Sequence, residues 1–354
     1  MKYKGFLALT LACVLLLSSA YVFAGTGKRI ATAGATELLI PVGARNTALA
    51  GANMAGVSGV DALYWNPAGV ALSDQSAEAR FSYQNWIGDI NVSYMAATTN
   101  LGAIGSLGLS VKTLNFGDIM ETTVINPEGT GSTFSPSYLT VGVTYSRKMT
   151  DRILFGATAK VVSEKIMGSS ASGVGFDFGL QYVSPVSGLK LGVALTNFSG
   201  NMKYEGSNLE QRVVLPGTEE GTVLTSVAVP TAKFEMPSQL KIGVSYELGF
   251  GEELGLDLMG TFVNNAYAFD QYIVGGELDF MNMFFLRASY ALAYKEGLDE
   301  DDTGFVSASE DFLFGPAFGL GIKLGSNVPV YLDYAYQITE FFDSAQWFSL
   351  SVGF

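Results

Sequence analysis

The sequence predicts an all-β fold: a transmembrane antiparallel β-barrel of about 14 strands, with an N-terminal lumenal hatch that contains short helical segments. Three observations predict this fold class. From Ala79 onward, segments of roughly ten residues alternate apolar with small or polar side chains. The connections between the segments alternate between short and long, and the chain ends on an alternating segment whose last residue is the aromatic Phe354.

The composition agrees with this class and excludes several kinds of chemistry. Charged residues are 15% of the 354 residues and the formal net charge is -13, whereas soluble domains average about 25% charged residues and nucleic-acid-binding surfaces are basic. The sequence has no histidine and one cysteine, Cys13, so the mature chain has no means to form disulfides, zinc sites of Cys or His, or a His-dependent nucleophile. We therefore expect no catalytic residues, no enzyme activity and no nucleic-acid partner.

Residues 1–24 have the pattern of a secretory signal peptide. Lys2 and Lys4 form the positive end, residues 6–17 the apolar core, and Val22-Phe23-Ala24 the small-residue cleavage site. An uncleaved anchor helix over the same apolar run is the alternative. We predict that the peptide is cleaved and that the mature chain, in which no second apolar run is long enough for a helical span, lies in the bacterial outer membrane.

Each predicted strand has one apolar face and one small or polar face. Ile242 and Tyr246 share a face, for example, while Lys241 and Ser245 share the other. The apolar face would meet a second sheet in a soluble sandwich and lipid in a membrane barrel. The even number of segments, and the alternation of short with long connections, favour the barrel, with both chain ends on the periplasmic side. The predicted strands are 79–86, 90–99, 105–114, 137–149, 153–167, 173–184, 189–200, 237–248, 253–263, 270–279, 283–294, 312–324, 329–337 and 346–354.

The last strand places Phe348, Leu350, Val352 and Phe354 on one face. An alternating last strand that ends in an aromatic resembles the terminal signal read by the outer-membrane barrel assembly machinery, which we expect as a partner during biogenesis. Aromatic residues near strand ends are expected either to form girdles at the two membrane interfaces or to follow ordinary strand propensity. These residues are Tyr83, Trp86, Tyr94, Tyr138, Tyr145, Tyr331, Tyr334 and Trp347.

The block ahead of the strands, residues 25–78, lacks their period and is too long for a simple linker. A barrel of this size has an interior too wide to be filled by its own strand side chains, so we expect the block to lie in the lumen as a hatch. The chain then divides into a signal peptide (1–24), the hatch (25–78) and the barrel (79–354). Within the hatch, Ala48–Ala55 is expected to form a short helix, and Asn66-Pro67 to force a turn because the residue before proline avoids the helical region.

The run GARNTALAGA from Gly43, then Asp61, then Tyr64-Trp65-Asn66-Pro67-Ala68-Gly69 resembles the FadL-like outer-membrane superfamily, whose members carry an Asn-Pro-Ala motif in an N-terminal hatch. It is more similar to the PorV/PorQ branch. The resemblance covers the whole mature chain by architecture and about residues 43–90 by motif. The residues that it marks as a structural or gating hatch motif are Gly43, Ala44, Arg45, Asp61, Trp65, Asn66, Pro67, Ala68 and Gly69.

The resemblance implies a monomeric barrel surrounded by outer-membrane lipid. In the PorV/PorQ branch it implies a component of type IX protein secretion or surface attachment, with secreted cargo proteins or secretion-system subunits as partners. The alternative is a FadL-like passive transporter of hydrophobic small molecules. The chain departs from the FadL pattern by being short, with modest outer loops.

Two long connections carry further hypotheses. The loop 299–310 matches the spacing of a calcium loop, with Gly304 at position 6. A solvated acidic loop explains the same residues, because the flanking segments read as strands rather than helices. The longest connection, 201–237, is expected to contain a small hairpin of Arg212–Leu215 against Thr222–Val227. Calcium is the only cofactor that the sequence suggests. Its candidate ligands are Asp299, Asp301, Thr303, Ser307 and Glu310.

Overall fold

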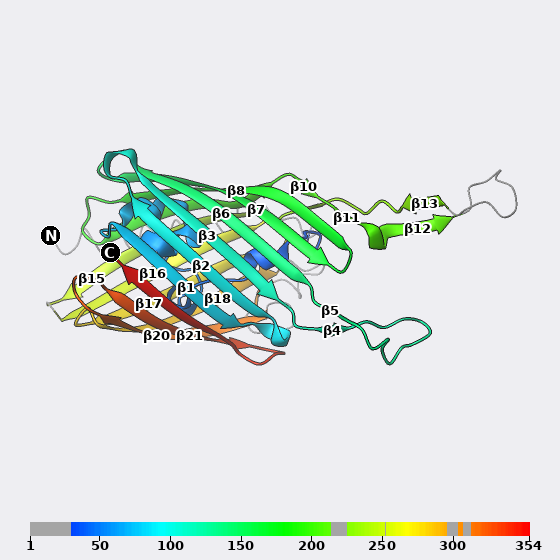
Figure 1. Cartoon of the computed structure of the whole chain (residues 1–354). Helices are drawn as coiled ribbons and strands as arrows, with labels where there is room; N and C mark the ends of the chain where they lie inside the picture. Colours follow the sequence, from blue (N-terminus) through cyan, green and yellow to red (C-terminus); the bar gives the residue numbers. More distant parts are fainter. Residues whose placement is uncertain (1–29, 214–224, 252, 296–303, 307–312) are drawn as a thin grey trace, which may run out of the picture.

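The computed structural model describes residues 30–213, 225–251, 253–295, 304–306 and 313–354. The predicted signal peptide lies outside these residues. Fourteen antiparallel strands form a closed barrel around a lumenal hatch (Figure 1). The barrel strands are β1 (Ala77–Asn85), β2 (Asn91–Asn100), β3 (Ser106–Asn115), β6 (Ser137–Lys148), β7 (Ile153–Ile166), β8 (Ser169–Val183), β9 (Leu189–Ser199), β15 (Gln239–Phe250), β16 (Leu254–Asn265), β17 (Asp270–Phe280), β18 (Phe284–Lys295), β20 (Phe314–Leu324), β21 (Val330–Thr339) and β22 (Ala345–Gly353).

Each barrel strand pairs with its neighbours in sequence, and β1 pairs with β22 to close the ring. At this seam Glu78 lies opposite Gly353, and the backbone N–H of Ser76 donates to the carbonyl of Phe354 at 2.8 Å. The final aromatic residue therefore takes part in closure. Closure matters because an open sheet edge would leave backbone groups without partners in lipid.

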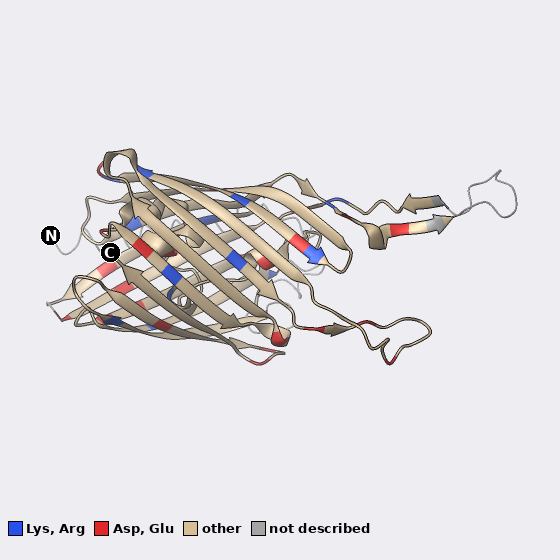
Figure 2. Ribbon diagram, viewed as in Figure 1, with Lys and Arg blue, Asp and Glu red and all other residues tan. Residues whose placement is uncertain are grey.

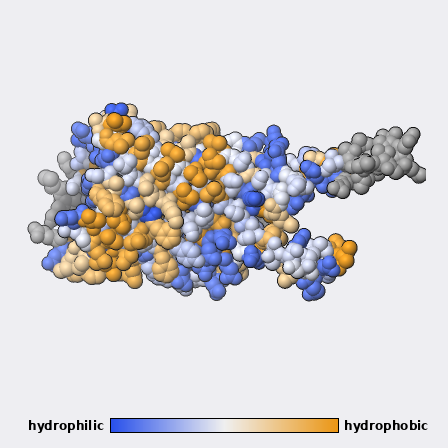
Figure 3. Space-filling model, in the orientation of Figure 1, coloured by the Kyte–Doolittle hydropathy of each residue, from blue (hydrophilic) through white to orange (hydrophobic). Residues whose placement is uncertain are grey.

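The alternation of the sequence decides which side chains face outward. In β22 the outward Phe348 and Leu350 are 53% and 42% exposed, whereas Trp347 and Ser349 between them are buried in the lumen. Figure 3 shows apolar side chains gathered over the strands and hydrophilic ones toward the long-loop end, and Figure 2 shows that charged residues are sparse along the strands. Among the described residues no helix is long and apolar enough to cross a bilayer. The exterior is that of a barrel that meets lipid.

The two ends of the barrel differ in their connections. At one end all connections are short, from 101–105 to 325–329, and β1 begins and β22 ends there (Figure 1). The other end carries the long connections, which is the asymmetry that the sequence predicts. Within them the structure has β4 (Ile119–Met120) with β5 (Thr133–Phe134), β10 (Asn201–Met202) with β14 (Phe234–Glu235), β11 (Tyr204–Gly206) beside β8, β12 (Glu210–Val213) with β13 (Thr225–Ala228), and β19 (Gly304–Val306) beside β18.

The predicted strand boundaries agree with the structure within a few residues. Of the hairpin expected in the longest connection, the described residues form β12 paired with β13, and residues 214–224 lie outside the described residues. The largest difference is the start of β8, at Ser169 rather than residue 173. Met167, at φ 51°, and Gly168 form a tight turn, so Ile166 already pairs with Ser169. The small residues after this turn carry no apolar alternation, and for that reason the sequence pattern places the strand too late.

The described part of the hatch, residues 30–76, lies inside the barrel (Figure 1). The helix expected at Ala48–Ala55 is wrong, because Ala50 (φ 49°) and Gly51 (φ 83°) take left-handed conformations that end it early. The hatch elements are the short helices η3 (Thr36–Leu39), α2 (Ala44–Ala48), η4 (Gly59–Asp61), α3 (Ala62–Trp65) and η5 (Pro67–Leu72). Three further short helices lie in connections: η6 (Ile87–Asp89), η7 (Gly102–Ile104) and η8 (Ser207–Leu209).

Three of the aromatic residues expected as girdle members lie inside the barrel instead. Trp86, Tyr94 and Trp347 are 9%, 5% and 0% exposed. The indole N–H of Trp347 donates to the carbonyl of Pro41 in the hatch at 3.2 Å. Of the two alternatives, girdle membership is therefore wrong for these three, because they face the lumen, where they pack on one another or on the hatch.

Candidate functional site

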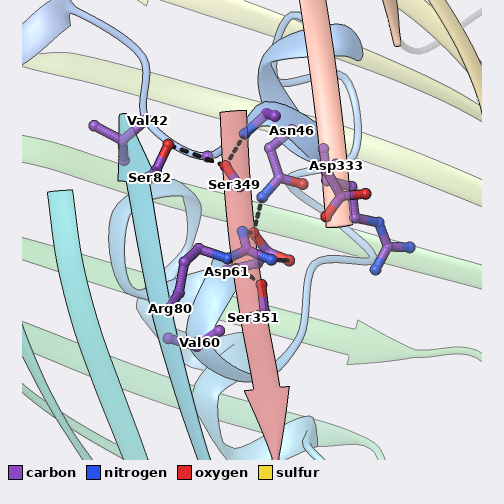
Figure 4. A network of polar contacts seen from close by, with 12 residues as sticks. Val42, Asn46, Val60, Asp61, Arg80, Ser82, Asp333, Ser349 and Ser351 are labelled. Atoms are coloured by element: carbon purple, nitrogen blue, oxygen red, sulfur yellow. Dashed lines mark hydrogen bonds and ion pairs between the residues drawn. The ribbon is translucent and has the colours of Figure 1, made fainter. Parts of the chain in front are cut away.

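The hatch is fastened to the barrel seam by a buried ion pair (Figure 4). Nη2 of Arg80, on β1, donates to Oδ2 of Asp61 at 2.9 Å, and the side chains are 4% and 8% exposed. The second carboxylate oxygen accepts from Nδ2 of Asn46 at 2.6 Å, and Nε of Arg80 donates to Oγ of Ser351 at 2.7 Å. Both carboxylate oxygens of Asp61 thus accept hydrogen bonds, and the pair bridges the hatch, β1 and β22.

A second ionic network fastens the hatch to β17 and extends to β18 and β21. Arg45 donates to both carboxylate oxygens of Glu277 on β17, at 2.7 and 3.1 Å. Glu277 is also paired with Arg287 on β18, whose Nη1 lies 2.6 Å from Oδ1 of Asp333 on β21. Two guanidinium groups and two carboxylates compensate one another, which allows all but Arg45 to be buried.

Gly43 and Ala44 bring the hatch backbone close to this network. Gly43 has a φ of 80°, and a Cβ there would lie 2.9 Å from Nη1 of Arg80. The N–H of Ala44 donates to Oγ of Ser349 at 2.7 Å, and Ser349 is hydrogen-bonded to Ser82 across the seam at 3.0 Å. Glycine is required at 43 both by its conformation and by the space that the guanidinium occupies.

Trp65 and Asn66 hold the middle of the hatch. The Trp65 indole N–H donates to the carbonyl of Val42 at 3.2 Å. Asn66 has an extended backbone before Pro67, as expected, and its Oδ1 accepts from the N–H of Ala68 at 3.2 Å to cap η5. Its Nδ2 donates to the carbonyl of Met54 at 3.1 Å, joining two parts of the hatch.

Pro67, Ala68 and Gly69 lie against the wall formed by β6, β7 and β8. The backbone of Pro67 touches the face of Gly156, and the carbonyl of Ala68 accepts from Oγ of Ser146 at 2.8 Å. A Cβ on Gly69 would overlap the carbonyl of Val57. All nine predicted motif residues therefore lie within the hatch or at its contact with the wall, although they form no single cluster.

The sequence pattern alone misses the barrel side of this interface. Glycines on the lumenal faces of strands receive the hatch, because a side chain at any of them would press on a hatch atom. The glycine on β7 contacts Pro67, and glycines on later strands contact progressively earlier hatch residues, ending with Ala48 at β20. The sequence does contain a signal for the barrel side of the interface, because glycine recurs on the polar face of successive strands. These glycines are Gly108, Gly156, Gly179, Gly192, Gly243, Gly275 and Gly319.

A cavity of about 300 Å³ lies between the hatch and the wall formed by β15 to β18 and β20. Lys241 reaches it from β15 and contacts the Trp65 ring, its Nζ lying 5.7 Å from the ring centroid. Its remaining polar lining is made of hydroxyl and amide groups. The apolar side chains that line it include Leu39, Pro41, Ala50, Tyr64, Trp65, Val263, Ala268, Phe269, Ile273, Ala291 and Phe314. No carboxylate lines it among the described residues, so it suits an uncharged apolar guest.

Glu37, a titratable residue of the hatch, lies near the carboxylate of Glu164. Glu37, in η3, is 5% exposed, and Nζ of Lys112 donates to its backbone carbonyl at 2.7 Å. Burial, followed by the nearby carboxylate of Glu164, raises the pKa of Glu37 to about 7. The protonated form of Glu37 is therefore favoured when the hatch is docked.

The five predicted calcium ligands lie outside the described residues. Of that loop, Gly304–Val306 is described, and it forms β19 beside β18. Among the described residues no group of three or more potential metal ligands occurs. Asp177, a carboxylate on the lumenal face of β8, is paired with Lys160 at 2.7 Å.

No protein-family model and no curated protein matches the sequence. Solved structures with a similar fold are FadL-type outer-membrane barrels. A Pseudomonas aeruginosa FadL homologue has 14% identity and a TM-score of 0.49, with 88% of this chain and 98% of that chain covered. The Pseudomonas putida toluene transporter TodX has 14% identity and a TM-score of 0.48, with 86% and 96% covered. The Ralstonia pickettii toluene transporter TbuX has 12% identity and a TM-score of 0.46, with 88% and 96% covered.

Proposed function

We propose that the protein is a passive conduit through which small hydrophobic molecules cross the bacterial outer membrane. The observation that carries this proposal is the cavity of about 300 Å³ between the hatch and the barrel wall. Its volume is at the lower end of the range for small-molecule sites, and its apolar lining would lose no hydrogen bonds to an apolar guest. A cationic guest would have to give up its hydration for a lining that is mostly hydrocarbon and that already contains the ammonium of Lys241.

The hatch forms one wall of this cavity, through Pro41, Tyr64 and Trp65. A guest that moves toward the periplasm therefore requires the hatch to shift, and the hatch is held by the ion pairs of Asp61 and Arg45. We assign the hatch motif two linked roles on this basis: it positions the hatch, and it sets the free energy needed to displace it.

A pair of neighbouring positions on β17 tests the proposal. Ile273 faces the cavity, and Val274 points outward with 60% of its surface exposed. In a heterologous host whose outer membrane contains the protein, Ile273→Trp should reduce uptake of radiolabelled naphthalene to the level of cells without it, whereas Val274→Trp should leave uptake unchanged. Equal uptake by cells with and without the wild-type protein would exclude this function for aromatic hydrocarbons.

A second candidate function, a PorV/PorQ-like component of protein secretion or surface attachment, is favoured by a different observation. The connection between β4 and β5 projects beyond the barrel, and Figure 3 shows apolar atoms at its end. Val124 and Ile125 there are 102% and 88% exposed. Exposed branched apolar side chains on an outer loop fit a contact with another protein.

Gentle purification from native outer membranes, followed by mass spectrometry, separates the two candidates. Stoichiometric secreted proteins or secretion subunits that are lost from a Val124→Ser, Ile125→Ser double variant would favour the second candidate. Bound lipid or hydrocarbon alone would count against it. Under either function we propose a monomeric barrel in outer-membrane lipid, inserted by the barrel assembly machinery.

A further inference from the structure

The ammonium group of Lys241 is buried without a counter-ion. Lys241 is 8% exposed and lines both the large cavity and a second one of about 40 Å³ beside it. Among the described residues no carboxylate or carbonyl accepts a hydrogen bond from its Nζ, and its one close polar contact is with the face of the Trp65 ring. A cation–π contact offsets part of the lost hydration, but it leaves the charge uncompensated.

The nearest carboxylate is already engaged. Both oxygens of Asp177 accept from Nζ of Lys160, at 2.7 and 2.8 Å, and one also accepts from the backbone N–H of Asn197 at 2.6 Å. Lys112, the third ammonium at this cavity, donates to the carbonyls of Glu37 and Ile40. Lys160 is thus neutralised and Lys112 has acceptors, whereas Lys241 has neither.

A second donor without an acceptor lines the same cavity. Thr196, on β9, is 4% exposed, and its hydroxyl has no hydrogen-bond partner. Thr196 pairs with Gln239 and Ala194 pairs with Lys241, so Thr196 and Lys241 are diagonal neighbours on the lumenal face. Diagonal neighbours in an antiparallel pair are within reach of one another when one side chain is long. A buried ammonium and a buried hydroxyl therefore line one small cavity, and neither is bonded to an acceptor among the described residues.

We infer that this cavity holds a small monovalent anion of the size of chloride, bound between Nζ of Lys241 and Oγ1 of Thr196. A volume of about 40 Å³ accommodates one ion or water-sized guest and excludes an organic molecule. A bound anion supplies the missing charge to Lys241 and the missing acceptor to Thr196. The site adjoins the large cavity, because Lys241 lines both, but it requires no passage of hydrophobic molecules and so stands or falls independently of that function.

Bromide is the probe, because it replaces chloride and scatters anomalously. Crystals of the full mature protein grown with bromide as the only halide should show an anomalous peak in contact with Lys241 and Thr196. In detergent at constant ionic strength, the Tm should rise as bromide replaces gluconate, since a ligand that binds only the folded state stabilises it. The Tm of Lys241→Met should not respond to the exchange, and that of Thr196→Val should respond less.

Lys203→Met is the matched control, because it removes an exposed ammonium that pairs with Glu205; its response to bromide should equal that of the wild type. The crystal experiment needs no variant, so it decides the matter even if Lys241→Met does not fold. A cavity without an anomalous peak at saturating bromide, or equal Tm values in bromide and gluconate, would overturn the inference. A peak that persists in Lys241→Met would overturn the role given to that residue.

Discussion

Asp61 and Arg80 form an ion pair in which a residue of the hatch and a residue of the first barrel strand are both almost fully removed from solvent. Each member of the pair makes one further hydrogen bond, Asp61 with Asn46 and Arg80 with Ser351. A buried pair of this kind adds little net stability compared with apolar residues of the same shape, but breaking it is costly. It therefore makes the docked position of the hatch specific.

Replacing Asp61 by Ala should strand a buried guanidinium and destabilise hatch docking by about 3–5 kcal/mol. Hydrogen exchange of residues 59–72 should speed up accordingly, while exchange in the barrel strands stays slow. Adding Arg80→Met should restore most of the protection, because it removes the stranded charge. Glu205→Ala, which breaks an exposed pair, is the control and should cost no more than about 1 kcal/mol. Slow exchange in Asp61→Ala would mean that the pair does not hold the hatch.

Gly156→Ala should displace the turn at Pro67. A Cβ at 156 would lie 2.5 Å from the backbone nitrogen of Ala68, and backbone atoms have no alternative rotamer to move to. We expect faster exchange over η5 and larger single-channel conductance in planar bilayers. Gly249→Ala, on β15, has open space around its Cβ and should behave as the wild type. Equal conductance in the two variants would show that the glycines do not determine the seating of the hatch.

Asn66→Ala should remove a helix cap and one of the two donors to the carbonyl of Met54, which also accepts from Nε2 of Gln181 at 3.3 Å. The loss of the cap costs about 1 kcal/mol, and the loss of one buried hydrogen bond about 1 kcal/mol more. Asn66→Asp keeps the cap acceptor but buries a carboxylate, so it should be at least as harmful as Asn66→Ala. Differential scanning calorimetry of the protein in detergent would measure both. Wild-type stability in Asn66→Asp would contradict the donor role of Nδ2.

Hatch docking should weaken as the pH rises from about 4.5 to about 7. The folded state raises the pKa of Glu37 from 4.5 to about 7, so across this interval the docked hatch holds a proton that the free chain releases. Stability therefore falls as the pH rises, by roughly 1.4 kcal/mol for each pH unit within the interval. Protection of residues 36–39 from hydrogen exchange should be greater at pH 5 than at pH 8, and Glu37→Gln should remove most of the pH dependence. The exposed Asp151→Asn is the control; a wild-type slope in Glu37→Gln would exclude Glu37 as the source.

The barrel is the part of the fold that the sequence predicts best, because alternation is a local signal and each strand carries its own copy of it. The outward faces, the short and long connections and the position of the last strand all follow from that period. Trp86 and Trp347 show the limit of a prediction from residue type. An aromatic residue near a strand end suits the membrane interface, but which side of the strand it lies on decides whether it faces lipid or lumen.

Only the hatch side of the candidate site can be predicted from the sequence. The hatch motif identifies Arg45 and Asp61, and both prove to be anchoring charges. Their partners, Glu277 and Arg80, come from strands whose register against the hatch is set by tertiary packing, so no local pattern identifies them. The cavity is likewise a property of the way the two parts fit together, and it has no sequence signature.

The contact between Arg80 and Ser351 has a consequence for the order of assembly. It joins the first and last strands of the barrel, and the same arginine holds Asp61. Arg45, near the start of the chain, meets a residue 232 positions later. We therefore expect the hatch, although it precedes the strands in the chain, to dock only after the ring is complete, because its binding surface on the barrel is formed by strands from both ends of the chain. In most soluble proteins the strands assemble around a collapsing core. In this protein we expect the barrel to close first and the hatch that fills it to dock afterwards.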